Sequence, residues 1–344
     1  MQRFFMVLLL IILSQSALAQ QKIVNVYAWS GEISDTLVKQ FEKETGIKVN
    51  FSTYQSNEIM FAKLRTTAAT SYDVIMPSGY FVDRMRKLNM LEEIDKSKLP
   101  NWKNLNPTFL HPAYDPDTKF SVPFIWGVTG IFVNSRYVNP KSIHSWQDLW
   151  NPRFENQLLM LDDTRELFSM ALITLGYSPD ETDPAHIQQA FLKLKALMKN
   201  VKVFSSETVI SIIIDEDAKL GMSWNGDAYK ASRDNPDIRF IFPEEGFIIF
   251  VDNFAIPKAA PHKDTAHAFI NFMLSAEAGK TTAVLMNYPI TNLAGQKLLP
   301  AEIRLNPIVY PSNAVMKHGI TQRDLSESAQ ELYEKYWEEL KMSG

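Results

Sequence analysis

The sequence contains no cysteine, which excludes disulfide bonds and thiolate metal ligands. It also lacks an H-E-x-x-H motif, a G-x-S-x-G elbow, a P-loop and a G-x-G-x-x-G loop, and its six histidines are scattered. Zinc proteases, α/β-hydrolases and nucleotide-binding enzymes usually carry one of these signatures. No nucleophile and base stand at a recognisable spacing. We therefore expect a protein that is not an enzyme and that holds neither a metal nor a cofactor.

Long apolar segments and strong net charge are also absent. After the N-terminal region, no apolar run approaches the roughly 20 residues that a membrane-spanning helix needs. The net charge of −4 argues against a nucleic-acid-binding surface. No internal repeat, low-complexity segment or flexible linker interrupts the 344 residues, of which 46% are hydrophobic. A chain of this size can bury a core large enough to fold without disulfides.

The N-terminus has the three parts of a secretory signal peptide. Arg3 supplies positive charge, residues 4–13 form a short apolar run, and Ala17-Leu18-Ala19 is a cleavage site of small residues. The apolar run is too short for a membrane anchor, and no cysteine follows it to carry a lipid. We therefore expect residues 1–19 to be removed and the exported mature chain to begin after them.

Strand and helix patterns alternate in the first part of the mature chain. Alternating apolar residues indicate strands at 22–28, 47–51 and 72–76, with helices at 34–46 and 56–66 between them. Such βαβ units pair their strands in parallel through right-handed connections. The first part of the chain therefore predicts an α/β unit with a parallel sheet.

A second unit begins near Gly127. The pattern indicates strands at 128–133, 158–161 and 218–224, and a strand at 247–256 that crosses back toward the first unit. Two α/β units that share strands predict two lobes, each with a mainly parallel sheet, joined by crossing strands. Ligands in such folds bind in the crevice at the carboxyl ends of strands. Further helices are indicated at 145–150, 186–198, 206–214, 265–273, 276–285 and 325–341.

Aromatic and acidic side chains gather at the ends of the predicted strands. Carboxylates accept charge-assisted hydrogen bonds from ammonium groups, and aromatic faces attract cations and pack along methylene chains. Because few basic residues stand among them, a linear polyamine, with an amine at each end and an apolar middle, matches the set. Its members are Trp29, Ser30, Glu32, Ser78, Tyr80, Asp163, Glu166, Trp224, Asp227, Phe250 and Asp252.

Structural roles are open for the same residues. Asp163 and Glu166 lie three positions apart at a predicted helix start, so both can face one amine, but Asp163 also fits an N-cap and Glu166 its capping-box partner. Trp29 and Trp224 also fit the core. Asp252 also fits an acceptor for backbone amides at a crossover. Arg165 is expected to pair with a neighbouring acid.

Several segments, in order and at this spacing, resemble the periplasmic spermidine/putrescine-binding proteins of polyamine ABC importers, a branch of the type II solute-binding proteins. The resemblance covers nearly all of the mature chain. It implies a bilobal α/β fold with the ligand cleft between the lobes. Lobe 1 would comprise 22–127 and 253–297, and lobe 2 would comprise 128–252 and 298–344. The segments are 45–64, 72–87, 121–134, 145–150, 161–172, 221–228, 252–257 and 287–294.

The resemblance also implies roles for single residues. Trp29 and Tyr80 resemble an aromatic clamp around the alkyl chain of the ligand, with Trp224 on the opposite lobe. Asp163 and Glu166 resemble the pair that holds one end amine. The remaining matches are Asp252 for another nitrogen, Ser30, Ser78 and Ser206 as polar contacts, Tyr288 near the pocket, and Gln322 after a one-residue shift of the alignment.

Three positions depart from the spermidine-binding pattern. Spermidine binders typically carry an aromatic residue where this chain has Glu32, and many carry tryptophan where it has Phe250. Asp227, in a W-x-x-D sequence, is more similar to the putrescine-preferring branch. The resemblance therefore implies spermidine or putrescine as ligand, with a slight preference for spermidine.

The function implied is capture of a polyamine in the periplasm and its delivery to an ABC-transporter permease in the inner membrane, by a monomer that binds no nucleic acid. Other solutes, namely a metal, thiamine or an anion, are alternatives within the same architecture. A polyamine sensor is a second alternative. An exported hydrolase that uses Asp163 and Glu166 is a third, although two acids three positions apart on one helix match the opposed carboxylates of glycosidases poorly.

Overall fold

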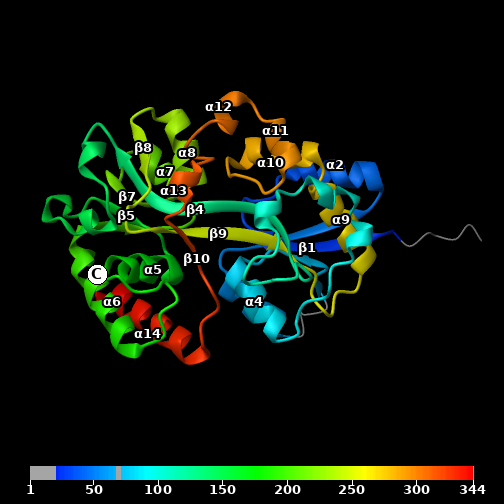
Figure 1. The fold of residues 1–344 in the computed structure, drawn as a ribbon, viewed down its shortest axis with the longest axis horizontal. Coiled ribbons are helices and arrows are strands. Elements are labelled where there is room, and N and C mark those ends of the chain that lie inside the picture. The colour runs from blue at the N-terminus through cyan, green and yellow to red at the C-terminus, as the bar shows by residue number, and fades with distance from the viewer. Residues whose placement is uncertain (1–20, 67–70, 344) are drawn as a thin grey trace, which may run out of the picture.

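The computed structural model describes residues 21–66 and 71–343, and within them the chain forms two α/β lobes joined by long strands (Figure 1). The expected signal peptide, residues 1–19, lies outside the described residues. The smaller sheet is parallel, in the order β2-β1-β3, as the sequence predicts. Its strands are β1 (Ile23–Trp29), β2 (Lys48–Tyr54) and β3 (Val74–Ile75).

The helices of this lobe begin and end where the sequence places their caps. Ser34 accepts a hydrogen bond from the Leu37 amide and begins α2, while Gly46 ends it in the left-handed region at φ 69°. Ser56 caps the next helix in the same way through the Ile59 amide. The helices are α2 (Asp35–Thr45), α3 (Asn57–Leu64) and α4 (Gly79–Lys87).

The larger sheet has the order β10-β9-β4-β7-β5-β6, and β8 pairs with β4 on the edge opposite β7, beyond the stretch of β4 that pairs with β9. It is mixed, because β4 runs antiparallel to β7, β8 and β9, whereas β5 pairs with β6 and β7 in parallel. The strands are β4 (Val122–Asn134), β5 (Leu158–Met160), β6 (Val201–Phe204), β7 (Leu220–Trp224), β8 (Ile238–Ile241), β9 (Phe247–Phe254) and β10 (Gly319–Thr321).

Two long antiparallel strands, β4 and β9, cross from one lobe to the other (Figure 1). β4 begins at Val122, earlier than the expected 128, and its register with β9 shifts between Pro123 and Ile125. Proline and glycine are unfavourable in a central strand. Because residues 122–127 include Pro123 and Gly127, the sequence pattern does not predict a strand there. The register shift accommodates Pro123, which has no amide hydrogen to donate.

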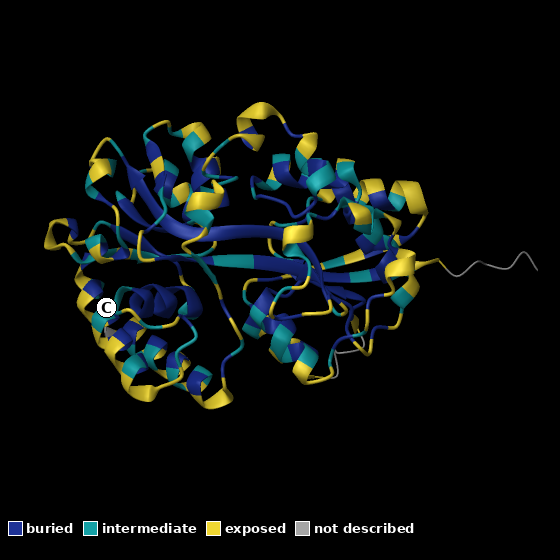
Figure 2. Cartoon of the chain, viewed as in Figure 1, coloured by how far each residue is buried: buried dark blue, intermediate teal, exposed yellow. Residues whose placement is uncertain are grey.

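The remaining helices cover the sheets. α5 is unusual because it is buried from Arg165 to Ile173, so the polar residues of its first turn lie inside the molecule (Figure 2). No helix among the described residues combines the length and the apolar character needed to cross a membrane. The helices are α5 (Thr164–Thr174), α6 (Pro184–Leu197), α7 (Val209–Ile214), α8 (Asn225–Asp234), α9 (Lys263–Met273), α10 (Ala276–Met286), α11 (Leu293–Lys297), α12 (Ala301–Arg304), α13 (Asn313–Met316) and α14 (Glu327–Ser343).

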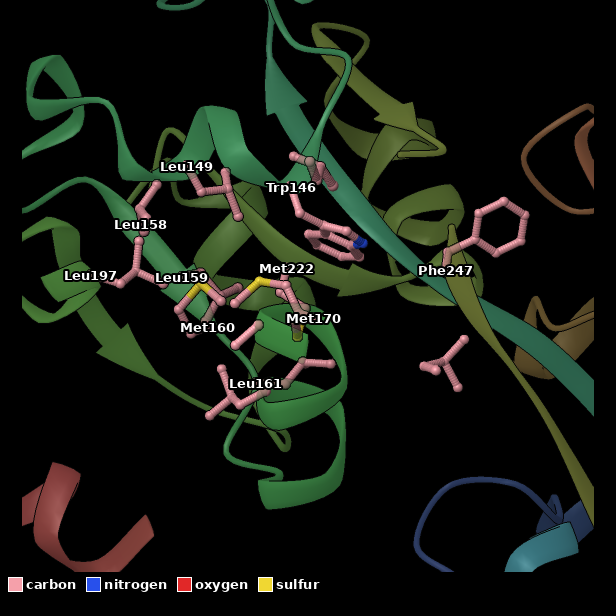
Figure 3. Packing of buried hydrophobic residues seen from close by; sticks show 14 of the residues in the cluster. Trp146, Leu149, Leu158, Leu159, Met160, Leu161, Met170, Leu197, Met222 and Phe247 are labelled. Atoms are coloured by element: carbon pink, nitrogen blue, oxygen red, sulfur yellow. The ribbon is translucent and has the colours of Figure 1, made fainter. Parts of the chain in front are cut away.

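Each lobe has its own large hydrophobic core. The core of the larger sheet surrounds Trp146, which is 2% exposed and packs with residues of β5, α5 and β7 (Figure 3). The C-terminal helix α14 contributes Tyr333 and Trp337 to the same core. The core of the smaller sheet includes Phe41 and Phe269 and stops at the crossing strands. The strand ends that carry the candidate site therefore lie between two separately packed bodies.

Candidate ligand-binding site

A pocket lies between the lobes, where the start of α4 faces β9 and the residues after β10. Four of the residues expected at the site line it: Ser78, Tyr80, Phe250 and Gln322. Gln322 is 9% exposed, and its amide donates to Ser169 Oγ at 3.1 Å. The pocket therefore brings together residues that are up to 244 positions apart in the chain (322 − 78).

Ser78 connects the start of α4 to the crossing strand β9. Its hydroxyl donates to Asp252 Oδ1 at 2.5 Å, and its amide donates to Asn57 Oδ1 at 3.1 Å. The Asn57 side-chain amide donates in turn to Ser78 Oγ and to the Tyr80 hydroxyl, each at 3.1 Å. Asn57 is 2% exposed and was not among the predicted site residues. Asn57 follows the N-cap Ser56 just after β2. Because ligand-binding residues in such folds lie at the carboxyl ends of strands, its position alone could have identified it.

Asp252 and Glu32 form the first acidic group together with Asp227. Burial raises the pKa of Asp252 to about 7, although the hydroxyl of Ser78 and the indole N–H of Trp29 lower it. The pKa of Glu32 lies well above its ordinary value, because the carboxyl is buried and faces Asp252 and Asp227. Glu32 Oε2 and Trp29 Nε1 are buried without a hydrogen-bond partner of good geometry. The Trp29 indole and the Glu32 carboxyl both lie beside the Asp252 carboxyl.

Asp227 lies in the first turn of α8, directly after β7. The Tyr288 hydroxyl donates to its Oδ1 at 2.9 Å, and burial raises its pKa to about 6. The Tyr288 ring packs edge-on against Phe250, with ring centroids 6.2 Å apart. Trp224, the N-cap residue of α8, is half-buried against the core of the larger sheet. The structure thus places Trp224 at the edge of the core.

The first turn of α5 carries the second acidic group. Asp163 is the N-cap of α5 and accepts from the Glu166 amide at 3.0 Å, so the structural role that the sequence left open for it is present. Glu166 is 6% exposed, and its Oε2 is buried without a hydrogen-bond partner, so it does not complete a capping box. Burial, with Asp163 nearby, raises the pKa of Glu166 to about 8. The Thr129 hydroxyl of β4, which was not predicted, lies beside it and lowers that pKa.

Glu58, in the first turn of α3, adds an acid that the sequence analysis did not include. Burial and the neighbouring Asp163 raise its pKa, whereas Arg165 lowers it. Arg165 is 7% exposed and pairs with Asp180 at 2.9 Å, which confirms that it binds a neighbouring acid. Its guanidinium also lies over the Tyr80 ring, 5.1 Å from the ring centroid. Glu58 and Tyr80 of one lobe therefore meet Asp163 and Arg165 of the other.

The remaining predicted residues lie at different depths. Trp29 is half-buried at the end of β1, with its ring centroid 4.9 Å from that of Tyr54. Ser206 is half-buried, and its hydroxyl is buried without a partner. Ser30 is exposed, and its amide donates to the Tyr54 carbonyl at 3.0 Å. Of the expected set, Ser30 is thus the residue that the structure leaves at the surface.

The site as a whole has six buried or half-buried carboxyl groups and few cations. The pKa of every acid in the two groups is raised, and burial is the largest cause for each. The cations that act on them are Arg165, already paired with Asp180, and the exposed Lys230. Buried carboxylates without a cation are costly, so the arrangement is suited to a positively charged ligand. The two groups are Glu32, Asp227 and Asp252, and Glu58, Asp163 and Glu166.

Tyr80 and Asn57 lie between the two acidic groups. Asn57 contacts Ser78, which binds Asp252 of the first group. Tyr80 has its pKa raised by burial and by Glu58 and Asp163 of the second group. Within the described residues, no group of three His, Asp or Glu side chains is placed to hold a metal ion. Asn57 and Tyr80 thus connect the two acidic groups through side-chain interactions.

The chain belongs to the bacterial extracellular solute-binding proteins, whose family model matches residues 36–307. It is therefore a solute-binding protein and not an enzyme, and the expected bilobal fold is confirmed. The spermidine/putrescine-binding periplasmic protein of Escherichia coli strain K12 is 44% identical over 315 residues, covering 92% of this chain and 90% of the relative. The putrescine-binding periplasmic protein PotF of the same strain is 34% identical over 317 residues, covering 85% and 84%.

A solved structure shows the same fold. The substrate-binding protein PotD of a spermidine/putrescine ABC transporter from Streptococcus pneumoniae matches with a TM-score of 0.80 and 32% identity. The match covers 94% of this chain and 99% of that one. The resemblance to polyamine-binding proteins expected from the sequence is thus confirmed over nearly the whole chain.

Proposed function

We propose that this protein binds a linear polyamine, spermidine or putrescine, in the cleft between its lobes and delivers it to the permease of an ABC transporter. The observation that carries the proposal is the pair of buried acidic groups. The cations that act on these groups are Arg165, which is paired with Asp180, and the exposed Lys230, and Tyr80 lies between the two groups. A flexible chain with an ammonium group at each end would neutralise both groups at once.

The ligand would be held at both ends and along its middle. One end ammonium would bind Asp163 and Glu166, and another nitrogen would bind Asp252, with Glu32 and Asp227 beside it. The methylene chain would pack on aromatic rings, which attract cations as well as apolar groups. The residues that we propose to line the site are Trp29, Ser30, Glu32, Ser78, Tyr80, Asp163, Glu166, Ser206, Trp224, Asp227, Phe250, Asp252, Tyr288 and Gln322.

Binding would close the two lobes around the ligand. We propose lobe 1 as 22–127 with 253–297 and lobe 2 as 128–252 with 298–344, so that the crossing strands β4 and β9 act as the hinge. A polyamine contacts acids of both lobes only when the cleft is closed. The ligand therefore shifts the population from open to closed forms by its stronger binding to the closed form.

The relatives and the N-terminal sequence support a proposal for the cellular setting. The two Escherichia coli relatives are named as periplasmic proteins. We propose that residues 1–19 direct the same location here and that the mature monomer meets its permease at the inner membrane. In this setting the closed, loaded form would be the one that the permease recognises.

Spermidine is proposed as the better ligand of the two. The first acidic group has three carboxyls, from Glu32, Asp227 and Asp252, which exceeds what one ammonium needs. A triamine places a second nitrogen near such a group, whereas a diamine does not. Spermidine would therefore neutralise more of the buried charge.

Titration calorimetry tests the proposal. Residues 20–344 are stripped of ligand by unfolding and refolding, and putrescine, cadaverine, spermidine and spermine are titrated in turn. One-to-one binding of spermidine or putrescine in the micromolar range or tighter is expected, with heats that depend on the buffer because the raised pKa values cause proton release. The absence of both heat and a thermal shift with every polyamine would refute the proposed function.

A further inference from the structure

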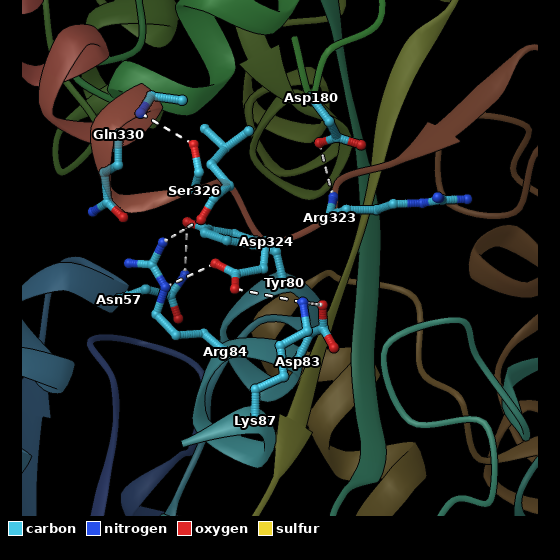
Figure 4. Close-up of polar contacts among 12 residues, drawn as sticks. Asn57, Tyr80, Asp83, Arg84, Lys87, Asp180, Arg323, Asp324, Ser326 and Gln330 are labelled. Atoms are coloured by element: carbon cyan, nitrogen blue, oxygen red, sulfur yellow. Dashed lines mark hydrogen bonds and ion pairs between the residues drawn. The ribbon is translucent and has the colours of Figure 1, made fainter. Parts of the chain in front are cut away.

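We propose that Arg84 and Asp324 clasp the two lobes at the rim of the cleft and thereby set how long a bound ligand is retained. This inference rests on the proposed function and adds to it two positioning residues outside the ligand site. The interlobe clasp consists of Arg84 and Lys87 of α4 on one side, and Asp324 and the Leu325 carbonyl on the other (Figure 4).

The geometry of the clasp is that of a partly desolvated, hydrogen-bonded ion pair. Arg84 Nε lies 2.8 Å from Asp324 Oδ1, and Arg84 Nη2 donates to the Leu325 carbonyl at 3.3 Å. Lys87 Nζ lies 3.7 Å from the second oxygen of Asp324. The side chains of Arg84 and Asp324 are only 15% and 13% exposed. Such a pair stabilises the contact between the lobes more than an exposed surface ion pair would.

The clasp joins elements that the crossing strands do not hold together. Arg84 lies on α4, which follows β3 of the smaller sheet, while Asp324 follows β10 at the edge of the larger sheet. The segment after β10 runs toward α14 along the side of its lobe that faces α4 (Figure 1). If the lobes rotate apart about β4 and β9, the Arg84–Asp324 contact must break, because its two halves move with different lobes.

Short stretches of chain connect both halves of the clasp to the ligand site. Tyr80 precedes Arg84 by four residues on α4, which places the two on one face of the helix. Gln322 precedes Asp324 by two residues. Closing the clasp therefore brings Tyr80 and Gln322, both lining the pocket, toward each other.

Within the larger lobe, Asp180 connects the segment that carries Asp324 to α5. Its Oδ1 accepts from the Arg323 amide at 2.8 Å and from Arg165 Nη2 at 2.9 Å. Arg165 stands between Asp163 and Glu166 on α5 and also donates to the Arg323 carbonyl at 3.3 Å. The segment that carries Asp324 is thus fixed to the helix that carries the second acidic group.

The clasp offsets the repulsion between the acids of the ligand site in the closed, ligand-free form. Without a ligand, closure brings the acids of the two lobes together in a dry cleft, which disfavours the closed form. The clasp is an attractive contact between the same lobes that involves none of those acids. Removing it should open the ligand-free protein and speed ligand loss, while leaving the acids and aromatic rings of the site in place.

The test is a double-mutant cycle with Arg84→Met, Asp324→Asn and the double variant. Arg86→Met is the matched control, because Arg86 lies on the same helix but binds Asp83 and the Tyr114 carbonyl within its own lobe. Spermidine affinity is measured by calorimetry and the dissociation rate by stopped flow. We expect each single variant to bind about five- to tenfold more weakly through faster dissociation, and the double variant to bind no more weakly than either.

Small-angle scattering of the ligand-free proteins provides a readout that does not depend on ligand. The two clasp variants should have a larger radius of gyration than the wild type and the Arg86→Met control. Wild-type affinity with unchanged scattering in the clasp variants, or losses that add in the double variant, would overturn the inference. If the wild type itself binds no polyamine, the proposed function has failed, whereas scattering still tests the clasp.

Discussion

The hydroxyl of Ser78 donates a 2.5 Å hydrogen bond to Asp252 and so joins the start of α4 to the strand that crosses between the lobes. The bond favours the ionised form of a carboxyl whose pKa burial raises to about 7. Because Asp252 is 3% exposed, few other groups are available to hold its charge. Ser78 thus acts on the proposed ligand site mainly through the charge of Asp252.

Replacing Ser78 by alanine should weaken polyamine binding in a way that depends on pH. If the pKa of Asp252 rises from about 7 by roughly one, its ionised fraction at pH 7 falls about fivefold, and affinity falls by a similar factor. At pH 8.5 the difference from wild type should shrink to less than about twofold. Calorimetry at the two pH values measures this; an equal loss at both would mean that the hydroxyl contacts the ligand directly.

Removing the charge of Asp252 should have a larger effect. The Asp252→Asn variant keeps the size of the side chain but leaves the first acidic group short of a carboxylate, and we expect at least a tenfold loss of affinity, about 1.4 kcal/mol. Asp117→Asn is the control, because its side chain is 74% exposed. Calorimetry with spermidine and putrescine measures the change. Unchanged affinity would remove Asp252 from the site.

Glu166 should destabilise the ligand-free protein at high pH. Its pKa is 4.5 in the unfolded chain and about 8 in the fold, so between these values the folded state binds a proton that the unfolded state does not. The free energy of unfolding therefore falls as pH rises from about 4.5 to 8, by up to about 1.4 kcal/mol for each pH unit. Glu166→Gln should match wild type at pH 5 and melt at a higher temperature at pH 8.5.

A contrasting control for this experiment is Glu42→Gln. Hydrogen bonds from Lys48 and the Val49 amide lower the pKa of Glu42, so its contribution to stability is present at high pH and lost as the pH falls. The two variants should therefore change the melting temperature at pH 8.5 in opposite directions. A lower melting temperature for Glu166→Gln at pH 8.5, measured by calorimetry without ligand, would contradict the proposed charge imbalance.

Gly127 on β4 should be sensitive to the addition of one methyl group. A Cβ atom there would lie 2.3 Å from the end of the Phe250 ring and 2.8 Å from Asn225 Oδ1, too close for either group to keep its place. In Gly127→Ala we expect Phe250 to be displaced from the pocket and polyamine affinity to fall about threefold to tenfold. Phe250→Leu in the same background should cause little further loss; a fully additive loss would show that the ring had not moved.

Much of the fold is predictable because its local signals are strong. Ser34 and Gly46 bound α2, and Asp163 starts α5, because a side-chain acceptor or a left-handed glycine satisfies backbone groups in any context. The parallel pairing of β1 follows from its alternation with helices. Such features depend on few neighbours in sequence and can be predicted from sequence alone.

Two pairs of the larger sheet, the antiparallel pair of β4 with β9 and the parallel pair of β10 with β9, are not predictable in this way. The early part of β4 contains Pro123 and Gly127, and the short β10 (Gly319–Thr321) has almost no pattern. Both are stabilised as strands by pairing with β9, a contact between residues far apart in the chain. Their strand conformation depends on tertiary contacts and not on the local sequence.

The candidate site shows the same division. Asp252 and Glu166 could be proposed from sequence because acids at strand ends are visible there. Thr129 could not, because nothing local distinguishes a β-strand threonine of the site from one at the surface, whereas Glu58, next to Asn57 after β2, could have been proposed from its position. Only the packing of α3 and β4 against α5 gives these two side chains their acidic neighbours.

The C-terminal helix α14 places Tyr333 and Trp337 in the same core as Trp146, although residues 253–297, between them in the chain, belong largely to other cores. A chain synthesised from its N-terminus therefore cannot complete the larger lobe until residues 325–340 have emerged. Until then, the apolar residues around Trp146 lack the side chains of α14 that complete their core. The order of segments along the chain thus delays folding until synthesis is almost finished.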